Sequence, residues 1–390
     1  MTWKKLSVVV RRLQLVKLAL KNQESLSQVC RRFGMSRKSG YKWLARFQRG
    51  GLPGLRDREC RPHRSPRQIS SEWVGRIRRL RRRYKSWGSR KLAARLGKEY
   101  RGQAVPCART IGNWLRRLKL SRRARRRSPA GPQLRRGSLT VARRSNHVWT
   151  VDFKGWFRTG DGQRVEPLTV RDAFSRYLLR VSLLRDQSWS QVRKIFLRLF
   201  RENGYPGVIR VDNGSPFGSK GPAGLTRLSA WWTALGIGVE FITPGHPEQN
   251  GAHEQMHRVL KSETTRPPSR HLRAQQRRIH RWVRVYNRIR PHQALGQRSP
   301  AQLYRPKAVQ TRKAVVSYPK GWAVRRVRTN GEVRWQGRKR FLGEAFVGFP
   351  VGIKIRDRGR WEVYFGSILL GELWESDAGG VRPARYVHAS

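Results

Sequence analysis

The hexapeptide Val148-Trp149-Thr150-Val151-Asp152-Phe153 decides the predicted fold. Its β-branched and aromatic residues favour a strand that presents Asp152 among apolar neighbours. Outward from it, strand-like segments cover residues 148–157, 165–171, 177–184, 207–211 and 238–242. Segments with apolar residues at helical spacing cover residues 189–202, 225–235 and 249–264. This order predicts an α/β core in which helices pack against a mixed five-stranded sheet.

The charge of the chain is strongly and unevenly positive. Its 390 residues include 87 Lys and Arg but only 23 Asp and Glu, a formal net charge of +64. Residues 1–145 alone contain 43 basic residues against 5 acids. Such a surface attracts phosphate through counterion release, so we expect DNA as the partner. A length of 390 residues also predicts two to four domains.

Cysteine spacing and hydropathy indicate the cellular compartment in which we expect the protein. Cys30, Cys60 and Cys107 lie far apart without a Cys-x-x-Cys pair. They therefore predict neither a disulfide framework nor a structural zinc site, and they suit a reducing cytosol. The first apolar stretch ends at Arg11, too early for a signal peptide, and no apolar run approaches the roughly 18 residues of a membrane span. We expect a cytoplasmic protein with no membrane partner.

Residues 1–60 have the outline of a helix-turn-helix domain. Apolar spacing predicts helices over residues 13–20 and 25–33, followed by a turn at Gly34. Ser36 is a favourable N-cap for the next helix. That helix carries four basic residues that we predict to bind DNA in the major groove, namely Arg37, Lys38, Lys42 and Arg46.

Residues 61–120 predict a second helix-turn-helix-like domain. Arg116 and Arg117 lie away from the apolar face of its last helix, and we expect both to bind DNA. Two tandem modules would grip a longer site than one. The predicted helices cover residues 72–84, 89–100 and 108–120. The next segment, residues 121–145, is rich in Arg, Pro and Gly and predicts a basic linker.

Carboxylates are so scarce here that acids set among apolar and basic neighbours are candidates for chemistry. Asp152 lies in the first strand, Asp212 at the end of the strand over residues 207–211, and Glu254 in the helix over residues 249–264. Phosphodiester cleavage needs a deprotonated nucleophile and a neutralised leaving oxygen, which two Mg²⁺ ions about 4 Å apart can supply. Three carboxylates from separate elements can hold such a pair. Each acid alone is equally consistent with an ordinary turn or a solvated position.

Six motifs follow one another along the chain. They are Val148-Trp149-Thr150-Val151-Asp152-Phe153, Asp172-Ala173-Phe174-Ser175-Arg176-Tyr177, Val211-Asp212-Asn213-Gly214-Ser215-Pro216-Phe217, Gly245-His246-Pro247-Glu248-Gln249-Asn250-Gly251-Ala252-His253-Glu254, Met256-His257-Arg258-Val259-Leu260-Lys261 and Tyr286-Asn287-Arg288-Ile289-Arg290-Pro291-His292-Gln293-Ala294-Leu295. In this order they resemble the DDE-type insertion-sequence transposases of the retroviral integrase superfamily. The close match covers residues 146–305, and the N-terminal modules fit the family more loosely.

The resemblance implies an RNase H-like integrase catalytic core over residues 146–305. A protein of this family binds the ends of a mobile element and catalyses metal-dependent 3′-end cleavage and strand transfer into target DNA. It implies that Asp152, Asp212 and Glu254 are catalytic residues and the ligands of Mg²⁺ or Mn²⁺, with two ions expected. It also implies a contact between Asn213 and DNA, a homo-oligomer on DNA, no small-molecule substrate, and a place at the nucleoid of a prokaryote.

The third acid requires a choice between Glu248 and Glu254. Counted from Asp212, Glu248 lies 36 residues on, near the family's common spacing of about 35, whereas Glu254 lies 42 residues on. We choose Glu254 because in this family the Glu follows Asn-Gly by a few residues. Arg258 and Lys261 lie four and seven positions after it, on the same helix face, where they could hold DNA phosphate. The extra residues are then expected in the loop over residues 219–224.

Two other functions use the same residues. His253-Glu254-Gln255-Met256-His257 is an H-E-x-x-H pattern, in which two histidines bind zinc in metalloproteases. That interpretation leaves Asp152, Asp212 and the basic modules unexplained. A non-enzymatic DNA-binding regulator with an inactive core is the other alternative, and the loss of one acid would favour it. All three acids are present.

The C-terminal residues predict one helix followed by a separate β domain. Residues 271–290 predict a long helix that closes the core. Residues 306–390 contain short strand-like segments and an Asn-Gly hairpin turn at Asn330. We therefore predict a small C-terminal β-barrel. The resemblance implies that this module helps to bind DNA, whereas the sequence alone is equally consistent with a plain cover over the core.

Overall fold

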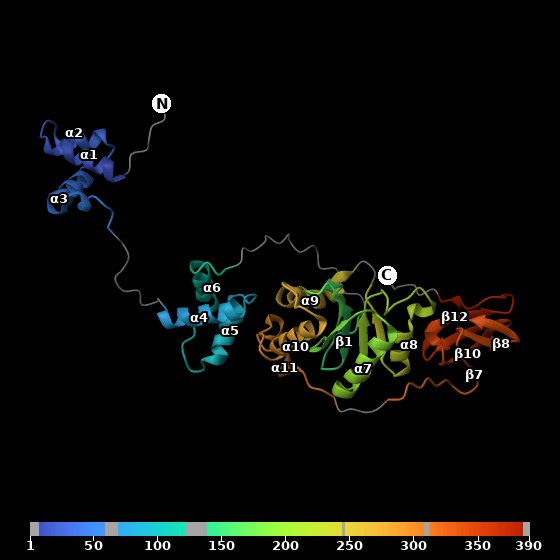
Figure 1. Cartoon of the computed structure of the whole chain (residues 1–390). Helices are drawn as coiled ribbons and strands as arrows, with labels where there is room; N and C mark the ends of the chain where they lie inside the picture. Colours follow the sequence, from blue (N-terminus) through green and yellow to red (C-terminus); the bar gives the residue numbers. More distant parts are fainter. Residues whose placement is uncertain (1–7, 59–68, 122–138, 244–245, 308–311, 385–390) are drawn as a thin grey trace. The chain divides into compact units, whose positions relative to one another are not determined.

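The computed structural model describes residues 8–58, 69–121, 139–243, 246–307 and 312–384 (Figure 1). Most of the predicted basic linker, residues 121–145, lies outside them. The chain divides into two compact units, Met1–Ile69 and Ser70–Ser390, and each is described by itself. No helix in the described ranges combines the length and apolar character needed to cross a membrane.

The first unit contains three helices, α1 (Val8–Leu20), α2 (Leu26–Arg32) and α3 (Arg37–Gly54). Ser25 caps α2 in a capping box with Gln28, and Ser36 caps α3 by accepting from the backbone N–H of Ser39 at 3.2 Å. Gly34 turns the chain between α2 and α3 with a φ of 63°. The predicted pair of helices is present. Its small core consists of Leu15, Val16, Val29, Cys30, Trp43 and Leu55.

The second unit begins with three more helices. They are α4 (Ser71–Arg83), α5 (Ser89–Glu99) and α6 (Ala108–Arg117), close to the predicted ranges. Ile77, Leu92 and Ile111 are fully buried among them. Arg81 is buried and donates to the backbone carbonyls of Trp87 and Leu120, so it ties the ends of this helical module together.

The central sheet is mixed, as predicted. Strand order is β2-β3-β1-β5-β6, with β4 also paired to β3. The β1–β3 and β3–β4 pairs are antiparallel, whereas β1–β5 and β5–β6 are parallel. The five main strands are β1 (Val148–Phe153), β3 (Arg164–Asp172), β4 (Leu178–Leu184), β5 (Val208–Val211) and β6 (Gly238–Phe241).

One predicted strand is wrong in extent. The segment over residues 148–157 is not a single strand, because β1 ends at Phe153 and a two-residue strand, β2 (Phe157–Arg158), follows. Gly155 lies between them with a φ of 78°, a conformation that an extended strand does not contain. The break leaves Lys154 directly after the strand that carries Asp152.

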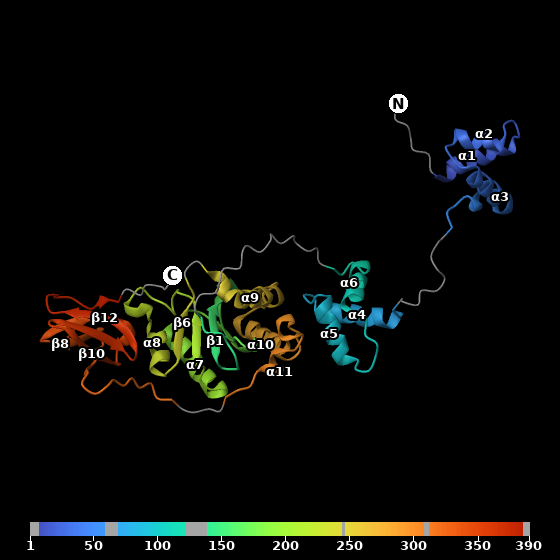
Figure 2. The same ribbon diagram turned by 180° about the vertical axis from the view of Figure 1, so that it is seen from behind.

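Helices cover both faces of the sheet. The pair α7 (Trp189–Asn203) and α8 (Arg227–Ala234) shares one hydrophobic cluster with β1 and β3, and the pair α9 (Gly251–Thr264) and α10 (Leu272–Arg288) shares another with β3 and β4. In Figures 1 and 2 the two pairs lie on opposite sides of β1. The core is therefore a three-layer arrangement of helices, sheet and helices.

Strand alternation assigns different chemistry to the two faces of β1. Trp149 and Val151 enter the apolar cluster beneath α7 and α8. Thr150 and Asp152 consequently lie on the opposite face, beneath α9. The register pairs Thr150 with Arg171 and Asp152 with Thr169 across β3, so four polar residues share this face. The first motif therefore contributes Trp149 and Val151 to the core on one face and Asp152 to the site on the other.

The C-terminal module forms two open sheets. A five-stranded sheet has the order β13-β12-β11-β10-β7, and β8 pairs with β9 in a separate hairpin. Predicted closure into one barrel is not confirmed, because β7 and β13 are edges of the larger sheet; β13 contains only two residues. One cluster joins these sheets to Leu225 and Ala230 beside and within α8. The strands are β7 (Ala323–Arg326), β8 (Glu332–Trp335), β9 (Arg338–Phe341), β10 (Pro350–Asp357), β11 (Arg360–Phe365), β12 (Ile368–Trp374) and β13 (Arg382–Pro383).

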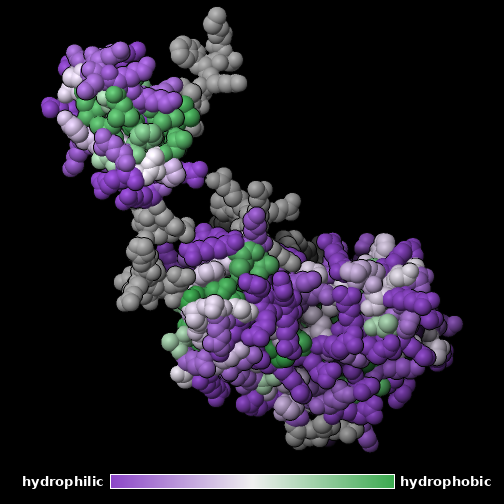
Figure 3. All heavy atoms as spheres, turned by 60° about the vertical axis from the view of Figure 1, so that its left-hand side comes forward, coloured by the Kyte–Doolittle hydropathy of each residue, from purple (hydrophilic) through white to green (hydrophobic). Residues whose placement is uncertain are grey.

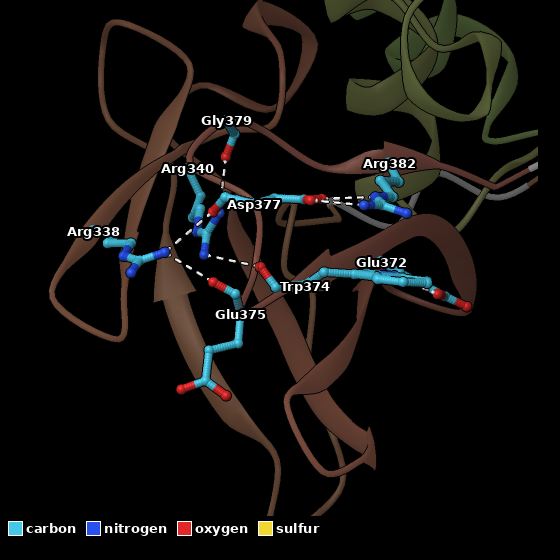
Figure 4. A network of polar contacts seen from close by, with 8 residues as sticks. All are labelled: Arg338, Arg340, Glu372, Trp374, Glu375, Asp377, Gly379 and Arg382. Atoms are coloured by element: carbon cyan, nitrogen blue, oxygen red, sulfur yellow. Dashed lines mark hydrogen bonds and ion pairs between the residues drawn. The ribbon is translucent and has the colours of Figure 1, made fainter.

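A buried arginine holds the segment between β12 and β13 in place (Figure 4). Arg340 on β9 is 1% exposed, and its guanidinium donates to the backbone carbonyls of Trp374, Asp377 and Gly379. The Asp377 carboxylate accepts two hydrogen bonds from Arg382, each 2.7 Å long. Because β13 is so short, we infer that these side-chain bonds, and not the ladder, fix this edge.

We predict that Arg340→Met loosens this edge locally. Removing the guanidinium leaves carbonyls without donors, at a cost of about 1–3 kcal/mol. Amide hydrogens over residues 375–382 should then exchange roughly 10- to 100-fold faster in hydrogen–deuterium exchange. Arg338→Met is the matched control, because Arg338 is exposed and donates to the same segment. Equal acceleration in both variants would contradict the structural role of Arg340.

Candidate active site

Asp152 lies at the end of β1 with 18% of its side chain exposed. The Asn250 side-chain amide donates to Asp152 Oδ2 at 3.3 Å, and His257 Nδ1 lies 3.6 Å from the same oxygen. Burial is the largest cause that raises the pKa of Asp152 to about 7; the negative charges of Asp212 and Glu254 contribute to the rise, and the positive charge of Lys154 opposes it. The three predicted acids therefore lie close enough together for Asp212 and Glu254 to affect the pKa of Asp152.

Asp212 directly follows β5, the parallel neighbour of β1. Parallel strands end at the same edge of a sheet, which brings Asp212 beside Asp152. Burial raises the pKa of Asp212, while the backbone N–H of Gly214 opposes that shift. Asp212 Oδ1 is buried without a hydrogen-bond partner in the described structure. A buried anionic oxygen in this state is available to a cation.

The Asn213 side chain does not point freely into this site. Its amide donates to the carbonyl of Ile242 at 2.6 Å and so ties the loop after β5 to the end of β6. The residue is nevertheless exposed. Its predicted contact with DNA stays a prediction.

Helix α9 has one buried face and one exposed face. Glu254, Arg258 and Lys261 are all exposed, as their spacing on one helix face predicts. The buried face contains His253, Met256, His257, Leu260 and Thr264. Glu254 thus lies next to a basic face and close enough to Asp152 to affect its pKa.

The ligand atoms that lie closest together are not those of the three acids. Among the described residues, one group of three potential metal ligands has all its ligand atoms within 4.8 Å of one another, and it consists of Asp152, His253 and His257. The rival residue Glu248 belongs to a short 3-10 helix (Pro247–Asn250), and its side chain lies outside the described part. The choice of Glu254 therefore stays a prediction.

The hydroxyl of Thr169 connects the two histidines to β1. Thr169 Oγ1 lies 2.9 Å from the Asp152 carbonyl oxygen, 2.6 Å from His253 Nε2 and 2.7 Å from His257 Nε2. His253 Nδ1 lies 2.9 Å from the Thr150 hydroxyl. Burial lowers the pKa of His253 strongly and that of His257 to about 3, so both rings are neutral near pH 7.

This arrangement does not favour the zinc-protease interpretation of H-E-x-x-H. Both Nε2 atoms have Thr169 as their partner, and His253 is 0% exposed. The Glu between them lies on the opposite, exposed face of α9. A metalloprotease needs the two histidines and an open position at one accessible metal ion.

Two buried residues of β3 position the surroundings of the site. Arg171 donates to the carbonyl of Ala252 at 2.8 Å and so fixes the first turn of α9, and burial lowers its pKa to about 10. Asp172, from the second sequence motif, accepts from the backbone N–H groups of Asn146 and Ser175. It closes the turn toward β4 and is structural.

Three residues near the acids were not singled out by the sequence analysis, namely Lys154, Thr169 and Asn250. Lys154 and Lys261 line a cavity of about 280 Å³ together with Trp156 and Leu260. The sequence contained a signal for Lys154, because the period of two in a strand places it on the face of Asp152. Thr169 had no such signal, since only the β1–β3 register brings it there.

The predicted DNA contacts of the helical modules are accessible. On α3, Arg37, Lys38 and Lys42 are exposed, whereas Arg46 is half-buried and stacks 5.0 Å from the Trp43 ring. On α6, Arg116 and Arg117 are both exposed. Figure 3 shows that hydrophilic residues cover most of the visible surface.

Comparison with protein families identifies the parts of the chain. Integrase core domain models match residues 142–247 and 235–300, and homeodomain-like domain models match residues 7–56 and 39–115. The IS481 family transposase C-terminal domain matches residues 322–373. The core and the C-terminal module are thus similar to those of DDE-type insertion-sequence transposases. The two N-terminal modules are homeodomain-like, and the core is of the integrase type.

Proteins of bacterial insertion elements are similar to part of this chain. The IS407 uncharacterized 31.7 kDa protein of Burkholderia multivorans is 30% identical over 182 residues, 46% of this chain and 62% of that protein. The IS476 uncharacterized 39.2 kDa protein of Xanthomonas euvesicatoria is 31% identical over 186 residues, 47% of this chain and 51% of that protein. The chain thus spans only about half to three-fifths of these two relatives.

Solved structures match at low TM-scores. The HTLV-2 integrase catalytic core domain in complex with magnesium is 17% identical, with 42% of this chain and 100% of that chain covered at a TM-score of 0.34. The simian T-cell lymphotropic virus intasome in complex with PP2A regulatory subunit B56 gamma is also 17% identical, with 75% and 97% covered at a TM-score of 0.37.

The raised pKa of Asp152 predicts a pH-dependent stability of the metal-free protein. The folded pKa of about 7 exceeds the ordinary value of 3.8, so the folded state binds more protons between about pH 4 and 7 and loses stability as pH rises through that window. Asp152→Asn should remove this loss. In EDTA we compare the free energy of unfolding of the variant with that of wild type. The difference, variant minus wild type, should be on the order of 1–3 kcal/mol larger at pH 8 than at pH 5.

Urea unfolding at the two pH values measures this difference. His257, with its lowered pKa, has the opposite slope below about pH 6.5, but it is present in both proteins. An identical free-energy difference between variant and wild type at pH 5 and pH 8 would contradict the raised pKa of Asp152.

Proposed function

We propose that this transposase binds the ends of its mobile element and catalyses metal-dependent 3′-end cleavage and strand transfer into target DNA. One electrostatic observation carries the proposal. Burial, with the charges of Asp212 and Glu254, raises the pKa of Asp152 to about 7. Three acids from β1, the end of β5 and α9 thus share a neighbourhood in a chain that otherwise has few acids.

The donor set fits hard divalent cations. Asp212 contributes a buried oxygen without a partner, and Asp152 has an unfavourable negative charge that a cation would stabilise. Asp152, Asp212 and Glu254 would hold two Mg²⁺ or Mn²⁺ ions. Such a pair supplies a deprotonated nucleophile and neutralises the leaving oxygen.

The other residues bind and orient. Arg258 and Lys261, exposed beside Glu254, would hold the phosphate of the reacting strand, and Lys154 lines the same cavity as Lys261. Asn250 orients the Asp152 carboxylate through its side-chain amide. Water first hydrolyses a phosphodiester at the element end, which frees a 3′-hydroxyl and leaves a 5′-phosphate on the other fragment. That hydroxyl then attacks a phosphodiester of the target strand and displaces a target 3′-hydroxyl, with no covalent bond to the protein.

The helical modules supply binding to the element ends. We propose that α3, with Arg37, Lys38, Lys42 and Arg46, enters the major groove and that Arg116 and Arg117 on α6 extend the contact. Two element ends must meet one target, so a homo-oligomer on DNA, at the nucleoid of a prokaryote, is part of the proposal.

The proposal also divides the chain into domains over residues 1–60, 61–120, 146–305 and 306–390, with a linker over residues 121–145.

The catalytic proposal predicts loss of both reactions when one acid is neutralised. Wild-type protein with element-end oligonucleotides and Mg²⁺ or Mn²⁺ should nick and join strands, as resolved on denaturing gels. Asp152→Asn and Glu254→Gln should reduce both steps by at least about 10³-fold, since the charge they hold is needed in the transition state.

Glu248→Gln is the matched control, because it removes the same charge six residues from Glu254. We expect it to retain activity within about threefold. Strand transfer that persists in Glu254→Gln, or is lost in Glu248→Gln, would contradict the assignment of Glu254 as the third acid. DNA binding without cleavage under any divalent ion would instead favour the non-enzymatic regulator.

Binding of the element ends should depend on salt through α3. The triple variant Arg37→Ala, Lys38→Ala, Lys42→Ala should lower the slope of log K against log salt by about 0.9 for each lost phosphate contact, nearly 3 in all. Fluorescence anisotropy over a salt series measures it. The control triple Arg11→Ala, Lys17→Ala, Lys21→Ala removes three exposed charges of the same unit. Equal slopes in the two triples would contradict the assignment to α3.

A further inference from the structure

The hydrogen-bond balance at Thr169 fixes the tautomers of both histidines. The hydroxyl has one proton and two lone pairs. Its 2.9 Å contact with the Asp152 carbonyl requires that proton, because a carbonyl only accepts. Both Nε2 atoms, at 2.6 and 2.7 Å, must therefore donate to Thr169. Each neutral ring then has an unprotonated Nδ1.

The two Nδ1 lone pairs have different surroundings. His253 Nδ1 lies 2.9 Å from the Thr150 hydroxyl, which also contacts the Arg171 carbonyl at 3.4 Å, so both nitrogens of this fully buried ring have partners. His257 Nδ1 faces Asp152 Oδ2 at 3.6 Å, and that oxygen accepts a hydrogen bond from Asn250. When Asp152 is ionised, two electron-pair donors therefore face each other. A neutral imidazole nitrogen opposite a carboxylate oxygen is the donor pair that a metal ion binds.

The spacing suits one shared ion. Ligand atoms each about 2.1 Å from one ion lie roughly 3.0–3.5 Å apart at octahedral to tetrahedral angles. The observed 3.6 Å needs only a small adjustment. Thr169 additionally orients the ring through Nε2, the usual way in which a hydrogen bond to the other nitrogen positions a metal-binding histidine.

We propose that His257 Nδ1 is a ligand, beside Asp152 Oδ2, of one divalent ion, and that this nitrogen makes the site favour transition ions such as Mn²⁺ over Mg²⁺. Mg²⁺ takes oxygen ligands. First-row transition ions also bind nitrogen donors, and Mn²⁺ is the weakest binder of that series. The inference rests on the proposed function in that Asp152 is taken as a metal ligand. His253 is not a ligand, because both its nitrogens already have partners.

Pulsed electron paramagnetic resonance of bound Mn²⁺ tests this directly. Untagged full-length protein in excess over Mn²⁺ should show coupling to a ¹⁴N nucleus. His257→Asn should abolish the coupling, because the Asn amide can still donate to Thr169 while presenting an oxygen to the ion. Mn²⁺ affinity should fall about 10-fold or more in this variant, and Mg²⁺ affinity by less than about threefold.

His280→Asn is the matched control. His280 belongs to α10 and contacts the Gln276 side chain, away from the acids, so the coupling should persist. Absence of nitrogen coupling in wild type, or its persistence in His257→Asn, would overturn the inference. Cleavage assays on the same preparations separate the two proposals. Cleavage without coupling refutes the nitrogen ligand alone, whereas coupling without cleavage refutes the transposase chemistry alone.

Discussion

One hydroxyl group determines how the site is assembled. Thr169 contacts the Asp152 carbonyl on β1 and the Nε2 atoms of His253 and His257 on α9, and these contacts use its full hydrogen-bonding capacity. The contacts fix the buried face of α9 over the sheet. Glu254 is thereby turned outward toward the basic face of the same helix. The position of an exposed acid thus depends on a neutral residue beneath it.

Local patterns in the sequence predicted much of the fold and part of the site. Ser36 was predicted as a helix N-cap, and the structure shows it in that role. Helical spacing placed Arg258 and Lys261 on the same face of α9 as Glu254, and all three are exposed. These predictions succeed because each depends on residues within one element, where backbone geometry alone sets the direction of the side chain.

Features that depend on distant residues could not be predicted. Thr169 meets Asp152 only through the register of β1 with β3. Helical spacing placed His253 and His257 on one face, but it could not show that this face is buried against a hydroxyl. In the C-terminal module, β13 has two residues and its edge is held by Arg340, so neither strand propensity nor periodicity reveals it. Closure of that sheet is likewise a tertiary property.

The net charge and the acidic site act over different distances. A formal charge of +64 attracts DNA at long range, but salt screens such attraction beyond about 8–10 Å. Asp152 and Asp212 act at contact, where burial weakens screening and raises the pKa of both. An anionic backbone cannot approach these acids without intervening cations. Arg258, Lys261 and bound divalent ions would satisfy that requirement, so DNA attraction and strand cleavage should respond separately to salt and to metal.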